Sequence, residues 1–164
     1  MLGIGEHRVV ISEIAETVSK PSDNWEDQTP QIEVKFKDEK GSVLTHWFQL
    51  KGFMQQKDYP NGKAPKGIAF RSSENGNENY AVDSATNERI EDEAKTATCL
   101  NIIGEFASDC GIAENTKITS TKQLLTLLQG AEVGIKVRAK SDDKVEYHYS
   151  MPVDRVKATE DAEA

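Results

Sequence analysis

The chain has 164 residues, a formal net charge of −8 and 37% hydrophobic residues. This length suits one domain with its own core, and no run reaches the ~20 apolar residues that a membrane-spanning helix requires. The start of the chain lacks the basic and apolar regions of a signal peptide. We therefore expect a soluble protein of the cytoplasm, or of a host cell's cytoplasm if the protein is viral.

The cysteines and histidines give no sign of a metal centre or a cofactor. Cys99 and Cys110 lie on one predicted helix, where a rise of ~1.5 Å per residue puts them ~16 Å apart, too far for a disulfide. We expect two buried thiols. The three histidines, His7, His46 and His148, are scattered, and neither CxxC nor HxxxH occurs.

The first third of the chain predicts strands. Residues 5–15 are rich in β-branched side chains and predict a strand, and residues 17–30 predict a loop because they are rich in Pro, Ser, Asp and Asn. Trp25 in this loop is expected to cover the core, with a second stacking site as the alternative. In residues 31–37 three apolar side chains alternate strictly with polar ones, which predicts a half-buried strand: Ile32, Val34 and Phe36.

A hairpin is expected next, with a second strand over residues 42–53. A two-residue turn would pair Phe36 with Val43. A three-residue turn pairs Phe36 with Leu44 and places the apolar side chains of both strands in the core, so we choose this register. Gly41 suits the left-handed position of such a turn. The opposite face then carries polar and aromatic side chains together: Lys35, Lys37, Thr45, Trp47, Gln49, Lys51 and Phe53.

The remaining elements complete a mainly β (α+β) fold. Short strands are predicted at 68–71 and 80–83 around a loop at 74–77. A helix is predicted over 93–110, buried through Ala97, Leu100, Ile103, Ala107 and Cys110, with Gly104 allowing close approach to the sheet and Gly111 as its C-cap.

The last third predicts a second helix and the closing strands. Ser120 and Gln123 form a capping box for a helix that ends near Gly130. Strands follow at 133–137 and 145–150 around a turn at 141–143, and residues 151–156 extend the sheet. Residues 157–164 predict a disordered acidic tail.

Charge and aromatic residues concentrate in one segment. Residues 35–71 contain eight basic and three acidic residues, a net +5 that leaves −13 for the rest, and six of the eleven aromatics. Single-stranded nucleic acid is bound by cations that follow the phosphates and by rings on which bases stack. We therefore predict a DNA-binding surface made of Lys35, Lys37, Trp47, Lys51, Phe53, Lys57, Tyr59, Lys63, Lys66 and Arg71.

Two other functions fit parts of the sequence. An Asp followed by an acidic-x-Lys triplet occurs in metal-dependent nucleases, and Asp23 with Glu33 to Lys35 imitates it. The aromatic face could instead be a protein interface of a structural or virion component. Because no phosphate loop or nucleophile motif is present, we expect a protein that is not an enzyme and has no catalytic residues.

The order of these segments resembles bacteriophage single-stranded DNA-binding proteins of replication and recombination modules. The resemblance covers most of residues 5–156 and includes GEHRVVISEIA, QIEVKFKDEKGSVLTHWFQLKGF, KTATCLNIIGEFASDCGI, the short helix ending at Gly130, AEVGIKVRAK and KVEYHYSMPVDRV. It implies an OB-fold, a five-stranded, partly open barrel with one or two packed helices, whose outer strand face and loops hold single-stranded DNA.

The resemblance also sets the expected domain and partners. Residues 1–156 form the OB-like domain and residues 157–164 the tail, which is similar to the acidic tails of bacterial single-stranded DNA-binding proteins. Those tails recruit replication partners through an apolar tip, which this chain lacks because it ends in Glu163 and Ala164. The expected ligand is single-stranded DNA, and replication or recombination proteins and a second copy of the chain are further possible partners.

Overall fold

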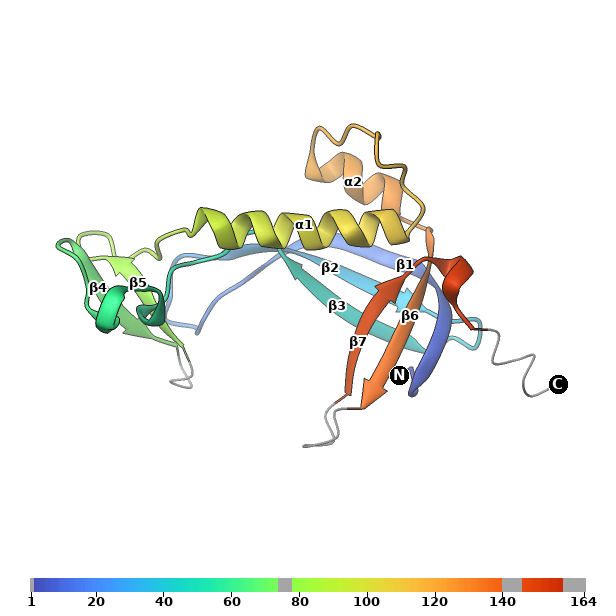
Figure 1. Cartoon of the computed structure of the whole chain (residues 1–164), viewed down its shortest axis with the longest axis horizontal. Coiled ribbons are helices and arrows are strands. Elements are labelled where there is room, and N and C mark those ends of the chain that lie inside the picture. Colours follow the sequence, from blue (N-terminus) through green and yellow to red (C-terminus); the bar gives the residue numbers. More distant parts are fainter. Residues whose placement is uncertain (1, 74–77, 140–145, 158–164) are drawn as a thin grey trace. The chain divides into compact units, whose positions relative to one another are not determined.

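The computed structural model describes residues 2–73, 78–139 and 146–157 (Figure 1). Within them the first strands are β1 (Gly5–Ser19), β2 (Thr29–Lys37) and β3 (Val43–Gln49), followed by β4 (Ile68–Ser72) and β5 (Asn79–Asp83). Helices α1 (Glu93–Asp109) and α2 (Thr121–Leu128) precede β6 (Glu132–Ala139) and β7 (Glu146–Met151). The predicted mainly β, α+β class is confirmed.

The strands form two sheets. An antiparallel sheet of five strands has the order β3-β2-β1-β6-β7, and β4 pairs only with β5. The residues fall into two compact units. Unit 1 comprises Met1–Ala15, Glu33–Trp47 and Ile102–Ala164, and unit 2 comprises Glu16–Ile32 and Phe48–Asn101.

Each unit has its own core. In unit 1 the inward side chains of β1 and β6 pair directly, as Val9 does with Val133, and Phe36 of β2 packs edge-on against Phe106 of α1 at 5.7 Å between ring centroids. In unit 2 the buried apolar side chains are Trp25, Ile32, Phe48, Ala81 and Val82. Apolar burial of this kind is the main source of each unit's stability.

The predicted register of the β2–β3 hairpin is confirmed. The backbone N–H of Asp38 donates to the carbonyl of Ser42 at 3.0 Å, which leaves a turn of three residues. Gly41 in this turn has a φ of 88°, the left-handed conformation that favours glycine. The backbone N–H of Leu50 donates to the carbonyl of Pro30 at 2.9 Å, in the same register.

The ends of both helices agree with the predictions. Gly111 follows α1 with a φ of 89°, and the Ser120 hydroxyl accepts from the backbone N–H of Gln123 at the start of α2. The Gln123 side chain accepts from the backbone N–H of Thr119 and not of Ser120, so only half of the predicted capping box forms. The buried face of α1 differs, because Leu100 is exposed and the buried residues are Ile103, Phe106 and Ala107. Nothing lies within 4 Å of a Cβ built on Gly104, so its predicted close approach to the sheet is wrong.

Some predicted strands have the wrong length. β1 continues to Ser19, into the segment 17–30 that was predicted to be a loop. β3 ends at Gln49, short of Phe53, because the chain turns onto α1 at Gly52. The backbone N–H of Gly52 donates to Thr96 Oγ1 at 2.9 Å, and a Cβ at this position would lie 2.3 Å from the Cβ of Lys95. Of residues 151–156 only Met151 extends the sheet, as the last residue of β7, and a 3-10 turn forms at Val153–Arg155 after Pro152.

Three further predictions concern the cysteines, the loops and tail, and membrane-spanning helices. Both cysteines are unpaired and half-buried, and burial raises the pKa of Cys110 to about 12. The loop at 74–77, the turn at 141–143 and residues 158–164 of the predicted tail lie outside the described residues. In the part of the chain that is described, no helix combines the length and apolarity needed to cross a membrane.

Candidate nucleic-acid interface

The ten predicted DNA-binding residues divide between the two units. Unit 1 contains Lys35, Lys37 and Trp47. Unit 2 contains Lys51, Phe53, Lys57, Tyr59, Lys63, Lys66 and Arg71. Three of the ten predicted residues thus belong to unit 1 and seven to unit 2.

Trp47 stands on the outer face of β3 in unit 1. Its side chain is 49% exposed, whereas Val34 and Phe36 on the inner face of β2 are fully buried. The indole Nε1 donates to Glu33 Oε2 on β2 at 2.9 Å, which holds the ring across the two strands. The predicted exposure of Trp47 is confirmed, and this ring is available for stacking.

The cations of unit 1 have acidic neighbours that the sequence argument left out. Lys35 Nζ lies 3.3 Å from Glu13 Oε2 of β1, and Glu33 is bonded to the indole itself. Lys37 is exposed at the end of β2. The local positive charge is therefore lower than a count over residues 35–71 indicates, because strand pairing adds carboxylates from outside that segment.

The sequence predicted that Phe53 shares a sheet face with Trp47. This prediction is wrong, because β3 ends at Gln49, before Phe53. It forms an isolated bridge with Glu91, and the guanidinium carbon of Arg89 lies 3.9 Å from its ring centroid. Lys51 forms an ion pair with Glu91 at 3.4 Å. Phe53 and Lys51 belong to the wall of a pocket in unit 2.

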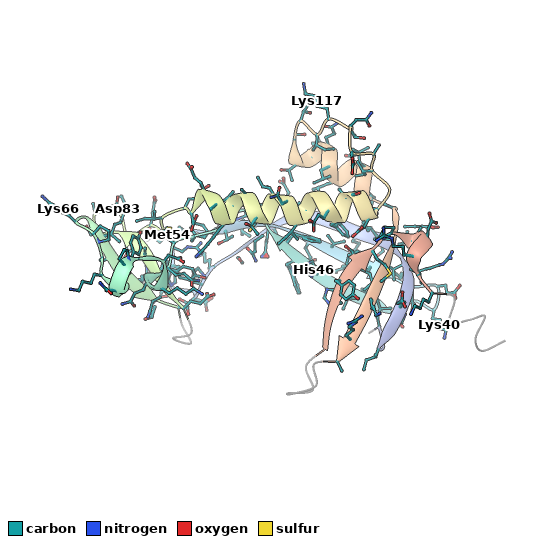
Figure 2. The ribbon with its side chains drawn as sticks, in the orientation of Figure 1. Lys40, His46, Met54, Lys66, Asp83 and Lys117 are labelled. Carbon is teal, nitrogen blue, oxygen red and sulfur yellow. The ribbon has the colours of Figure 1, made fainter. Side chains whose placement is uncertain are left out.

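The other predicted residues of unit 2 fall into two kinds. Lys57, Lys63 and Lys66 are exposed, and Lys66 extends from the chain that leads into β4 (Figure 2). Tyr59 packs against Phe70 at 5.9 Å between centroids, and Arg71 lies 4.0 Å over the ring of Trp25 while donating to the carbonyl of Asn24. Tyr59 and Arg71 therefore contribute to packing within the unit.

The most buried charge among the described residues of unit 2 was not predicted from the sequence. The Arg89 side chain is only 3% exposed, and its Nε donates to Asp27 Oδ2 at 2.6 Å. Its guanidinium carbon lies 5.3 Å from the ring centroid of Tyr80, whose edge packs on Trp25. A single arginine in a polar stretch gives no periodic signal, so nothing in the local sequence could have identified it.

Arg89 lies in the wall of an open pocket of about 770 Å³. The wall contains aromatic rings, cations and polar side chains, all from unit 2: Ser19, Lys20, Pro21, Thr29, Gln49, Lys51, Gly52, Phe53, Gln55, Ser73, Glu78, Tyr80, Arg89, Lys95 and Cys99.

The chain matches no family model and no curated protein.

Burial shifts the pKa values of titratable groups in both units. In the pocket, burial and a hydrogen bond to Glu78 raise the pKa of Tyr80 to about 12. In unit 1, His148 Nε2 lies 3.0 Å from His46 Nδ1, and burial together with the neighbouring His148 lowers the pKa of His46 to about 4. This histidine contact joins β3 to β7, the two outer strands of the five-stranded sheet.

The residues of the nuclease alternative have other partners. Glu33 accepts the indole N–H of Trp47, and Lys35 pairs with Glu13. Over the described residues, no three His, Cys, Asp or Glu side chains gather in a group that could hold a metal ion.

Proposed function

We propose that the protein binds single-stranded nucleic acid without sequence preference, and that its natural ligand is single-stranded DNA, which it coats and protects during replication or recombination. The observation that carries this proposal is the half-exposed indole of Trp47 on the outer face of β2 and β3. Every base has a π-face, so a ring of this kind accepts any sequence.

The order of the elements supports an OB-like fold. An OB-fold has a three-strand meander, a helix, and two closing strands, and it binds ligands on the outer face of its second and third strands. Here β1, β2 and β3 are followed by the β4–β5 hairpin, α1, α2, and then β6 and β7. Strands β1, β2, β3, β6 and β7 form one sheet, and His46 on β3 contacts His148 on β7. Trp47 and Lys35 lie on β3 and β2, the strands that such a fold uses for binding.

The charges beside Trp47 support a salt-sensitive, moderate affinity. Lys37 is exposed, and Lys35 can exchange its exposed partner Glu13 for a phosphate, because an exposed ion pair contributes little free energy. Each phosphate contact releases counterions, so we expect the affinity to fall as salt is raised.

Fluorescence titration with oligo-dT tests the proposal. Base stacking should quench Trp47, and the quenching should disappear in Trp47→Phe, in which only the buried Trp25 remains to report. Trp47→Ala should weaken binding by ~1–3 kcal/mol whichever bases are offered. Leu127→Ala is the matched control, because Leu127 is an apolar side chain of similar exposure, 43%, on α2.

The same titration compares single-stranded DNA with duplex DNA as the ligand. We expect oligo-dT to bind more tightly than duplex DNA, because paired bases cannot stack on the ring. An affinity for oligo-dT that Trp47→Ala leaves unchanged would overturn the proposal.

A protein interface is the second candidate for the same face. Val43 lies on the same side of β3 as Trp47 and is also exposed, at 39%, so the two form a small apolar strip. A protein partner would bury this strip, and oligonucleotides would then leave the fluorescence of Trp47 unchanged.

A further inference from the structure

The pocket of unit 2 has the chemistry of a site for a small anionic ring compound. Its volume of about 770 Å³ is within the range of ligand sites, ~300–1,000 Å³. Its wall contains four cations and one carboxylate, that of Glu78, which already accepts the hydroxyl hydrogen of Tyr80. Carboxylates beside the wall pair with three of these cations, and Lys20 has no such partner among the described residues, so the wall offers paired and unpaired cationic donors next to aromatic rings.

Two of the cations are fixed in place by the protein. Lys95 on α1 forms an ion pair with Asp58 and donates to the carbonyl of Phe53 at 3.0 Å. Arg89 is held by Asp27, yet its Nη2 is buried and has no hydrogen-bond partner among the described residues. An unpaired buried donor is uncommon in native proteins and indicates a polar group that a ligand or water can satisfy.

The other two cations lie closer to solvent. Lys20 is exposed directly after β1, which ends at Ser19, and no described carboxylate lies within ion-pair distance of it. Lys51 has an exposed partner, Glu91. Neither lysine has to give up a buried contact to bind a phosphate.

The rings lie beside the fixed cations. Arg89 stacks on one face of Phe53, and Tyr80 is held edge-on to Trp25 and by Glu78. Gln49, Gln55 and Ser73 add donors and acceptors of the kind that the edge of a base requires. A planar heterocycle joined to a phosphate matches this wall better than an apolar ligand or a bare anion does.

We propose that this pocket binds one nucleotide, with the base against Tyr80 and Phe53 and the phosphate beside Lys20 and Lys51. The nucleotide can be free or can be one residue of a single strand. The second source rests on the proposed function, whereas the first does not. The site belongs to unit 2 and uses none of the residues around Trp47.

Cys99 gives a direct readout of this site in the unmodified chain. Its thiol is half-buried in the pocket wall, one helical turn after Lys95. The other cysteine, Cys110, has its pKa raised to about 12 by burial and should react slowly with thiol reagents. The rate of modification at pH 8 therefore reports on Cys99, and Cys99→Ser measures the background.

The experiment follows the reaction of Cys99 with a disulfide reagent in the presence of dTMP, oligo-dT or inorganic phosphate. We expect saturating dTMP or oligo-dT to slow the reaction at least about fivefold, and phosphate alone to have a smaller effect. Lys20→Gln should raise the concentration of dTMP needed for half-protection roughly two- to fivefold, because one exposed cation is lost.

The outcomes separate the two proposals. Protection by dTMP without quenching of Trp47 by oligo-dT would support the pocket and overturn the proposed function. Quenching of Trp47 by oligo-dT, with no protection of Cys99 by either ligand, would overturn the pocket alone. Neither outcome requires a variant that disturbs the core.

A second measurement fills the pocket in a protein that is already folded. A bulky maleimide coupled to Cys99 should abolish binding of dTMP, while the same reagent applied to Cys99→Ser should leave binding intact. Unchanged dTMP binding after complete coupling would show that the nucleotide lies elsewhere.

Discussion

The two tryptophans of the chain differ in exposure, and each differs from what the polarity of its neighbours in sequence suggests. Trp25 lies among Asn24, Glu26 and Asp27 and is 1% exposed, whereas Trp47 lies in an apolar strand and is 49% exposed. Strand alternation turns Trp47 outward. Trp25 is buried because Arg71 and Tyr80, both distant in sequence, pack on its ring. Exposure here depends on strand geometry and tertiary partners more than on local polarity.

The largest effect that tests this comparison is on stability. Trp25→Ala should lower the free energy of unfolding by about 3–5 kcal/mol, since it leaves a cavity and removes the surface on which Arg71 stacks. Trp47→Ala should lower it by less than about 1 kcal/mol, because its ring is half in solvent. Urea denaturation followed by circular dichroism measures both. Equal losses in the two variants would contradict the comparison.

A smaller effect concerns pH and should distinguish the two units. All three histidines lie in unit 1, and unit 2 has none. Burial lowers the pKa of His46 to about 4 and also lowers the pKa of His148, whereas an unfolded histidine has a pKa of ~6.5. As pH falls below 6.5 the unfolded chain takes up protons first, so the stability of unit 1 should decline between pH 6.5 and 4.

The decline should be about 1–2 kcal/mol after allowance for solvent around the partly exposed rings. Denaturation at several pH values measures it. Replacing both His46 and His148 by Gln should flatten the dependence, while His7→Gln on β1 should preserve it. A slope that persists in the double variant would assign the effect to other groups.

The smallest expected effects come from the exposed ion pairs. Glu13→Gln releases Lys35 beside Trp47, and Glu91→Gln releases Lys51 at the pocket of unit 2. Each change should alter stability by less than about 1 kcal/mol. Glu13→Gln should tighten oligo-dT binding roughly two- to fivefold at low salt, and Glu91→Gln should do so for dTMP protection of Cys99. Both gains should shrink at high salt.

The parts of the fold that were predictable are those with a local cause. The alternation of Ile32, Val34 and Phe36 predicted β2 and the hairpin register, and Ser120 and Gly111 predicted helix ends, because strand period and capping act over a few residues. The end of β3 was not predictable, since it depends on Lys95 and Thr96 lying against Gly52.

In the candidate site, too, only the features with a local cause were predictable from the sequence. Alternation along one strand was enough to place Trp47 on the outside. Glu13 and Arg89 have no local signal, because the one pairs with Lys35 through strand pairing and the other is buried by contacts with Asp27 and Phe53. Charge counted along a segment therefore overestimates charge on a surface wherever neighbouring strands supply carboxylates.

The contact at Gly52 has a consequence for how the protein tolerates sequence change. Any side chain at this position meets the Lys95 Cβ at 2.3 Å and the Lys95 carbonyl carbon at 2.9 Å, atoms that cannot rotate away. In a saturation-mutagenesis library selected for folding, position 52 should be depleted of all nineteen replacements, while the neighbouring Lys51 and Phe53 accept several. The constraint comes from the space between two backbones, so no change at Lys95 that keeps a Cβ can relieve it.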